Sequence, residues 1–172
     1  FRRTPAARPL VLGHRGGGQA APENTVAAFD LARREGADGV ELDVRLDASG
    51  AVVVAHDPDL ARVTSGASAR RVDELTTAEL RALSVGSGER VPLLGDVLDW
   101  GFAHDLVVNV EVKSDVRSPR RLLERVVREL ARAEDASARV VVSSYHAGFV
   151  RVLASCLARL PVWWLAHGRQ RV

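Results

Sequence analysis

The chain has 172 residues, of which 47% are hydrophobic and 27% are charged, and its formal net charge is +2. This apolar content excludes a disordered chain, because it is sufficient for a buried core. The 24 basic residues are spread along the chain, which argues against a nucleic-acid partner. One cysteine excludes a disulfide framework, and no apolar run approaches the ~18 residues of a transmembrane segment.

The beginning of the chain predicts two strands with a helix between them. Apolar residues at 10–12 indicate a short first strand. The next apolar-periodic segment, which follows Asn24-Thr25, is typical of a helix that starts at the asparagine and ends at Gly36. A second strand is expected over 39–46, directly after this helix.

A third strand and an insertion are expected next. The strand covers 51–57 and follows a short turn. The segment 58–92 then lacks strong apolar periodicity, apart from a short helix near 76–83. We interpret 58–92 as an insertion after the third strand, followed by a helical turn or two over 94–100.

The second half of the chain continues the alternation of strands and helices. Cys156 lies in an apolar helical stretch and is expected to be a small core residue. The predicted elements are a strand over 106–113, a long helix from Pro119, a strand over 139–145, a helix over 148–159 and a strand over 161–166.

Repeated strand–helix units with Val-rich strands predict an α/β fold with a parallel sheet covered by helices. Six strands correspond to about six of the eight units of a TIM (β/α)₈-type barrel, and an open doubly wound sheet is the alternative. Polar residues near the ends of several strands favour the barrel. We expect residues 1–172 to be a single truncated domain of this kind, whose natural start is missing because the chain begins at Phe1 and contains no methionine.

Acidic side chains interrupt two of the predicted strands near their ends. Glu41 and Asp43 share one face of their strand, and Glu111 shares a face with Lys113. Carboxylates that meet at one mouth repel each other unless a cation lies among them. Oxygen ligands without cysteine suit one hard divalent ion, Mg²⁺ or Ca²⁺. The alternative is that these acids pair with the many arginines.

Two histidines and two cations lie at the ends of the same group of strands. His14 and His56 are candidates for a general acid and base, because imidazole titrates nearest to neutral pH. A single histidine is more often structural, but two at adjacent strand ends favour catalysis. Arg15 and Lys113 can bind an anion, and glycines at 16–18 allow close backbone approach. The set favours phosphoryl chemistry over acyl transfer, for which no Gly-x-Ser-x-Gly motif is present.

These residues resemble the motifs of the glycerophosphodiester phosphodiesterase family. The matching segments form an ordered series that spans nearly the whole chain. They are 14–17 (His-Arg-Gly-Gly), 21–29, 36–44 with Glu41-Leu42-Asp43, 53–58 with His56-Asp57, 75–76 with 79–80, 91–94 and 109–113, and 143–145 resembles a later strand of the family.

The resemblance implies a TIM-type barrel with a small insertion after the His-Asp strand. It implies hydrolysis of small glycerophosphodiesters, such as glycerophosphocholine or glycerophosphoethanolamine, to glycerol 3-phosphate and an alcohol. Water or the substrate's own glycerol hydroxyl remains open as the attacking group. The implied site has Glu41, Asp43 and Glu111 as ligands of one divalent metal, His14 and His56 as the acid–base pair, and Arg15 and Lys113 on the phosphate.

Other functions and properties remain open. A lysophospholipase D or sphingomyelinase D-like activity would need an apolar surface for a lipid tail, and a non-catalytic phosphodiester-binding barrel is the third reading. The family's last two strands are expected to be absent. Trp163, Trp164 and His167 lie near the end of the last predicted strand, where aromatic residues line a pocket less often than they join a core. The oligomeric state is open, and the cytoplasm is the favoured compartment.

Overall fold

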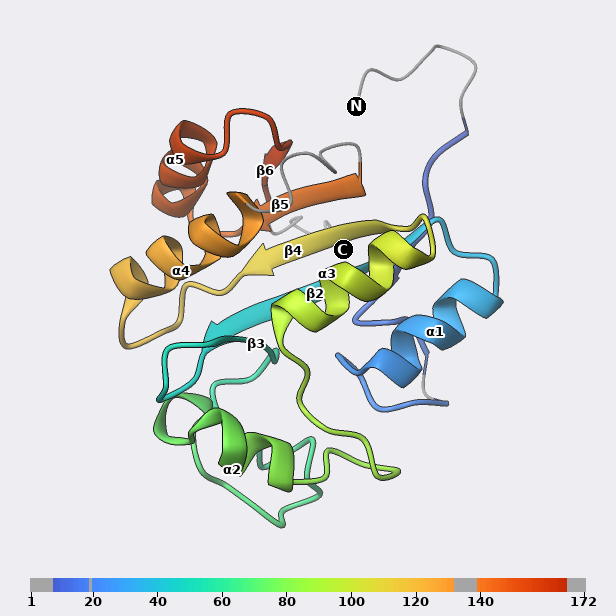
Figure 1. Ribbon diagram of the computed structural model, residues 1–172, viewed down its shortest axis with the longest axis vertical. Coiled ribbons are helices and arrows are strands. Elements are labelled where there is room, and N and C mark those ends of the chain that lie inside the picture. The colour runs from blue at the N-terminus through green and yellow to red at the C-terminus, as the bar shows by residue number, and fades with distance from the viewer. Residues whose placement is uncertain (1–7, 19, 132–138, 167–172) are drawn as a thin grey trace, which may run out of the picture.

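The computed structural model describes residues 8–18, 20–131 and 139–166 and consists of one sheet with helices packed against it (Figure 1). The elements are β1 (Leu12–His14), α1 (Val26–Arg34), β2 (Gly39–Leu46), β3 (Val52–Val54), the 3₁₀ helix η1 (Val72–Glu74), α2 (Thr77–Ala82), α3 (Leu94–Ala103), β4 (Val107–Val112), α4 (Pro119–Ala131), β5 (Val140–Ser144), α5 (Ala147–Cys156) and β6 (Val162–Trp164).

Five strands form the parallel part of the sheet, in the order β1-β2-β4-β5-β6 within the described residues. This order follows the chain in one direction. A doubly wound sheet reverses its order near the first strand, so the predicted alternative is excluded. The architecture is α/β and corresponds to part of a (β/α)₈ barrel, as the sequence predicted.

We predicted strand β3 as a further parallel strand, but this was wrong: it pairs with β2 in antiparallel orientation. The two strands are joined by a tight turn in which Asp47 accepts hydrogen bonds from the backbone N–H of Ala51 and, through its own carbonyl, of Gly50. Gly50 adopts a φ of +84°, which favours glycine. A parallel crossover needs a dozen or more residues, so this short turn permits only a hairpin.

The main core lies on one face of the sheet. Alternate β2 residues Val40, Leu42 and Val44 are buried there against apolar side chains from α1, α3, α4 and α5. The opposite face of the same strand carries Glu41 and Asp43, which are also buried. Because side chains alternate along a strand, one face serves packing and the other collects polar groups.

The insertion has a second, smaller core that shares strand β3 with the main core. Val52 and Val54 pack into the main core, whereas Val53 and Ala55 pack against apolar residues of the insertion. The predicted short helix is present as α2, and Thr76 and Glu79 form a capping box at its start. The remaining buried members of this second core are Leu60, Val72, Leu75, Leu80, Val85 and Val91.

Two sequence expectations about apolar residues were wrong. Cys156 is exposed although it shares a helix face with Phe149 and Leu153, because it is the last residue of α5, where Leu157 rather than Cys156 is buried. Trp163 and Trp164 are 45% and 65% exposed rather than in the core, since β6 is the last strand in the order of the described sheet. His167 lies outside the described residues. Within those residues, no helix combines the length and the apolar character that crossing a membrane requires.

Candidate active site and metal centre

Three carboxylates meet on the polar face of the sheet. Glu41 and Asp43 lie on β2 and Glu111 on β4, and the parallel register places Asp43 beside Glu111. Each offers an oxygen within 4.8 Å of the other two, and all three residues are buried. The structure therefore brings together the acidic residues that the sequence singled out.

The cluster has unsatisfied hydrogen-bonding capacity. Oε1 of Glu41 is buried and accepts no hydrogen bond from any described residue, and the buried Oδ1 of Asp43 lies 3.3 Å from Nζ of Lys113 without hydrogen-bond geometry. Burial, together with the negative charges of Asp43 and Glu111, raises the pKa of Glu41 to about 7. Buried carboxylate oxygens without donors are costly unless a cation binds them, so this donor set fits a hard divalent ion.

Lys113 is directed toward these acids. Its Nζ lies 2.9 Å from Oε1 of Glu111 and 3.3 Å from Oδ1 of Asp43. Burial alone would lower the pKa of Lys113, but the contacts with Glu111 and Asp43 outweigh it and raise that pKa. Arg15 adds a second cation, with Nε 3.3 Å from Oδ2 of Asp43. Both residues predicted to bind phosphate thus border the acidic cluster.

Asn24 orients Asp43, a role that the sequence reading missed. Its side-chain amide donates to Oδ2 of Asp43 at 2.9 Å, and its Oδ1 accepts from the backbone N–H of Asp43 at 3.4 Å. Asn24 is buried with a φ of +57°, which asparagine tolerates better than most residues. We predicted it as the start of the helix, but Thr25 is the residue that caps α1.

The turn after β1 carries the His-Arg-Gly motif. Arg15 and Gly16 have φ values of +54° and +94°, and a Cβ on Gly16 would lie 2.5 Å from that of Ala28. This turn directs the Arg15 backbone N–H to Oε2 of Glu41 at 3.0 Å. His14 is 71% exposed, with Nε2 3.8 Å from the same oxygen. The glycine is therefore required for α1 to approach the turn closely.

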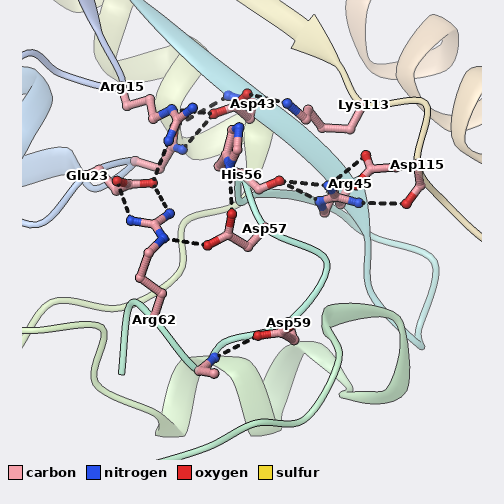
Figure 2. A network of polar contacts seen from close by, with 12 residues as sticks. Arg15, Glu23, Asp43, Arg45, His56, Asp57, Asp59, Arg62, Lys113 and Asp115 are labelled. Atoms are coloured by element: carbon pink, nitrogen blue, oxygen red, sulfur yellow. Dashed lines mark hydrogen bonds and ion pairs between the residues drawn. The ribbon is translucent and has the colours of Figure 1, made fainter. Parts of the chain in front are cut away.

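His56 follows β3 and is held through both its ring and its backbone. Its Nδ1 lies 2.7 Å from Oδ1 of Asp57, and its carbonyl accepts hydrogen bonds from the guanidinium of Arg45 at 2.7 and 3.0 Å. Arg45 is buried on the polar face of β2 and also donates to both carboxylate oxygens of Asp115 (Figure 2). No sequence motif predicts this role of Arg45, since only the fold brings it to the His56 backbone.

The histidines and cations of the predicted site line one cleft of about 440 Å³. Glu111 also lines it, while Glu41 and Asp43 contact the cleft residues Arg15 and Lys113 from the buried side. All seven predicted residues are thus gathered around one cleft. The residues that line it are His14, Arg15, His56, Glu111, Val112, Lys113, Ser114, Asp115 and Tyr145.

Comparisons with known proteins place the chain among its relatives. Residues 14–172 match the glycerophosphoryl diester phosphodiesterase family. A glycerophosphodiester phosphodiesterase of Caldanaerobacter subterraneus is 36% identical over 146 residues, which are 81% of this chain and 59% of that protein.

Solved structures show the same fold. The crystal structure of a glycerophosphodiester phosphodiesterase from Agrobacterium tumefaciens superposes with a TM-score of 0.77 at 28% identity, covering 90% of this chain and 66% of that one. A phosphodiesterase from Oleispira antarctica, solved with its product sn-glycerol-3-phosphate, has a TM-score of 0.82 at 24% identity and covers 95% of this chain and 68% of that one, which supports the fold alone.

The chain spans about 59% of the length of the curated relative from Caldanaerobacter. The match to the family nevertheless covers nearly the whole of the present sequence, and it includes both histidines and all three clustered carboxylates. The chain therefore belongs to the glycerophosphoryl diester phosphodiesterase family.

Proposed function

We propose that this protein hydrolyses small glycerophosphodiesters to glycerol 3-phosphate and an alcohol, with the cleft at the ends of β1, β3 and β4 as the active site. The observation that carries the proposal is the cluster of Glu41, Asp43 and Glu111 beside a cleft lined by His14 and His56. Membership of the family supports the reaction type.

Glu41, Asp43 and Glu111 would hold one divalent ion, Mg²⁺ or Ca²⁺. The buried Oε1 of Glu41, which accepts no hydrogen bond from the described residues, and the raised pKa of Glu41 support this assignment. When bound, such an ion withdraws electron density from phosphoryl oxygens and acidifies a hydroxyl. Lys113 lies within 3.3 Å of two of these carboxylates, so it would balance part of their charge and remain available to the phosphate.

His14 and His56 would exchange protons with the attacking oxygen and with the oxygen of the departing alcohol. One imidazole takes the proton of the attacking hydroxyl as its oxygen bonds to phosphorus. The other gives a proton to the oxygen of the alcohol as its bond to phosphorus breaks. Arg15 would bind the phosphate oxygens, and its own position is fixed by contacts with Glu23 and Asp43.

The insertion argues for a small substrate rather than a lipid. A lipid tail needs an exposed apolar surface. None of the exposed large hydrophobic residues falls in 58–92, a segment that the structure describes completely. We therefore rank a lysophospholipase D or sphingomyelinase D-like activity below the hydrolysis of small diesters.

Release of glycerol 3-phosphate tests the proposal directly. The protein is incubated with glycerophosphocholine, glycerophosphoethanolamine or lysophosphatidylcholine, each with Mg²⁺, Ca²⁺ or a chelator. We expect release from the first two substrates, and we expect the chelator to abolish it.

Variants connect that activity to the site. Glu111→Gln should remove it, whereas the matched control Glu124→Gln, an exposed carboxylate on α4 paired with Arg120, should not. Activity that survives the chelator would contradict the metal-dependent reaction. Choline release, which reports cleavage of glycerophosphocholine and lysophosphatidylcholine alike, measures the preference between them, and faster release from lysophosphatidylcholine would overturn the assigned substrate class.

A further inference from the structure

Arg62 lies in the insertion and is connected through Asp57 and Glu23 to two residues that line the cleft, His56 and Arg15 (Figure 2). Its Nε donates to Oδ2 of Asp57 at 2.7 Å, and its two Nη atoms donate to the two oxygens of Glu23 at 2.7 Å each. Asp57 in turn contacts Nδ1 of His56 at 2.7 Å, and Glu23 accepts from Nη1 of Arg15 at 3.2 Å. One guanidinium therefore lies between a candidate acid–base group and a candidate phosphate ligand.

We propose that Arg62 is a positioning residue of the active site, which fixes the imidazole of His56 through Asp57 and the guanidinium of Arg15 through Glu23. The inference rests on the proposed hydrolase function, because it assigns a purpose to the orientation of these two groups. Arg62 lies outside the β-strands and does not line the cleft. It therefore acts on the reaction only through Asp57 and Glu23.

The Asp57 branch selects the tautomer of His56. Burial alone would raise the pKa of Asp57, but the hydrogen bonds from Arg62 and His56 outweigh burial and lower it. An ionised carboxylate can only accept hydrogen bonds, so Nδ1 of His56 must carry the proton in the Asp57 contact. The neutral imidazole then has an unprotonated Nε2, which is the nitrogen left for proton exchange with substrate.

The Glu23 branch restricts Arg15. The hydrogen bond from Arg62 lowers the pKa of Glu23 despite burial, so this carboxylate remains charged between the two guanidinium groups. Arg62 occupies both oxygens of Glu23 and thereby fixes its plane. Arg15 therefore meets a rigid acceptor on one side and Asp43 on the other.

Stability alone does not account for the arrangement. The Arg62 side chain is 51% exposed, and ion pairs of that exposure contribute little to folding. Arg70 gives the matched comparison within the same insertion, because it is 53% exposed and pairs with Glu79 without leading to the cleft. If Arg62 acts by positioning, the two arginines differ in their effect on turnover rather than on melting temperature.

The experiment compares kcat, KM and melting temperature for wild type, Arg62→Gln, Arg62→Lys and the control Arg70→Gln, with glycerophosphocholine as substrate. We expect Arg62→Gln to lower kcat by about 10- to 100-fold, the usual cost of losing an orienting partner, with a melting temperature near that of the control. KM should rise as well, through Arg15. Arg62→Lys should recover part of kcat, since an ammonium can contact one of the two carboxylates.

Nitrogen-15 NMR of the imidazoles, assigned with His56→Ala, supplies a readout that is independent of activity. Wild-type His56 should carry its neutral proton on Nδ1, and Arg62→Gln should shift the population toward Nε2–H. The inference is overturned by wild-type kcat in Arg62→Gln, by equal loss of kcat in Arg70→Gln, or by an identical tautomer ratio in wild type and Arg62→Gln.

One outcome separates this inference from the function on which it rests. A wild-type protein that releases no glycerol 3-phosphate would refute the proposed function, and the His56 tautomers would still decide the role of Arg62. If Arg62→Gln does not fold, the wild-type tautomer and the Arg62→Lys kinetics decide it instead.

Discussion

The parallel sheet and the insertion contribute to the cleft in different ways. The sheet supplies the acidic cluster from buried, alternating positions of β2 and β4, where each side chain is fixed by the strand that carries it. The insertion supplies Arg62, a half-exposed side chain on an irregular segment, which reaches the cleft through Asp57 and Glu23. The three carboxylates are therefore placed by regular strands, whereas the orientation of His56 and Arg15 depends on a long-range contact with the insertion.

This difference has an energetic counterpart. Glu41 has a buried oxygen that accepts no hydrogen bond from the described residues, and three carboxylates lie close together, so the sheet holds an electrostatic cost that a bound cation would offset. The ion pairs of Arg62 are partly solvated and cost little to keep. Substitutions in the sheet should therefore change the reaction far more than substitutions of equal charge in the insertion.

The largest effect is expected for a carboxylate of the sheet. Asp43→Asn should reduce glycerol 3-phosphate release to background, because it removes a charged candidate ligand at the centre of the cluster. The matched substitution in the insertion, Asp73→Asn, should leave turnover close to wild type, since Asp73 pairs with Arg71 and Arg117 away from the cluster. Equal losses of initial rate in Asp43→Asn and Asp73→Asn would contradict this difference between the sheet and the insertion.

The next largest loss of activity is expected for substitutions of the two cleft histidines. His14→Ala and His56→Ala should each lower kcat by about two to four orders of magnitude, the usual contribution of a general acid or base. His104→Ala is the control, because His104 is exposed at the end of α3 and contacts the carbonyl of Trp100. A nearly wild-type rate for either cleft histidine removes that residue from the mechanism.

A smaller effect is expected for the residue that orients Asp43. Asn24→Ala removes both hydrogen bonds to Asp43 and should weaken the apparent affinity for the activating ion by ~10- to 100-fold. The dependence of initial rate on Mg²⁺ or Ca²⁺ concentration measures this shift. If Asn24 acts only on folding, the ion concentration that gives half-maximal rate will not change.

The smallest effect concerns the stability of the metal-free protein. The pKa of Glu41 is raised from 4.5 to about 7, so the folded state binds more protons than the unfolded state between these values. The free energy of unfolding should therefore fall as pH rises through this window, by at most ~3 kcal/mol. Denaturation in a chelator at several pH values measures it, and an equally steep fall in Glu41→Gln would contradict the cause.

Sequence patterns predicted the clustered carboxylates of the sheet because the alternation of side chains along a strand leaves few possible arrangements. Once 39–46 is a strand with one apolar face, Glu41 and Asp43 must share the other, and a parallel neighbour brings Glu111 to the same edge. Helix boundaries were also close, although the cap of α1 is Thr25 rather than Asn24. The hairpin of β3 was readable in principle from the shortness of the turn at 47–50.

The remaining features depend on contacts between segments far apart in the chain. Arg62 lies 39 positions from Glu23, and Arg45 lies 70 positions from Asp115, so neither pair leaves a local pattern. Exposure of Cys156 and Trp164 likewise depends on which neighbours cover α5 and β6. Local sequence predicted the chemistry of the cleft but not the residues that hold it in place.

Titration calorimetry of Mg²⁺ and Ca²⁺ into wild type and Glu41→Gln tests the central claim most directly, that the three sheet carboxylates form a metal site. Because Gln keeps the shape of Glu41 without its buried charge, the variant should melt no lower than wild type. We predict one bound ion per wild-type chain and none in Glu41→Gln. Equal binding by both proteins, or no binding of either ion by wild type, would contradict the account.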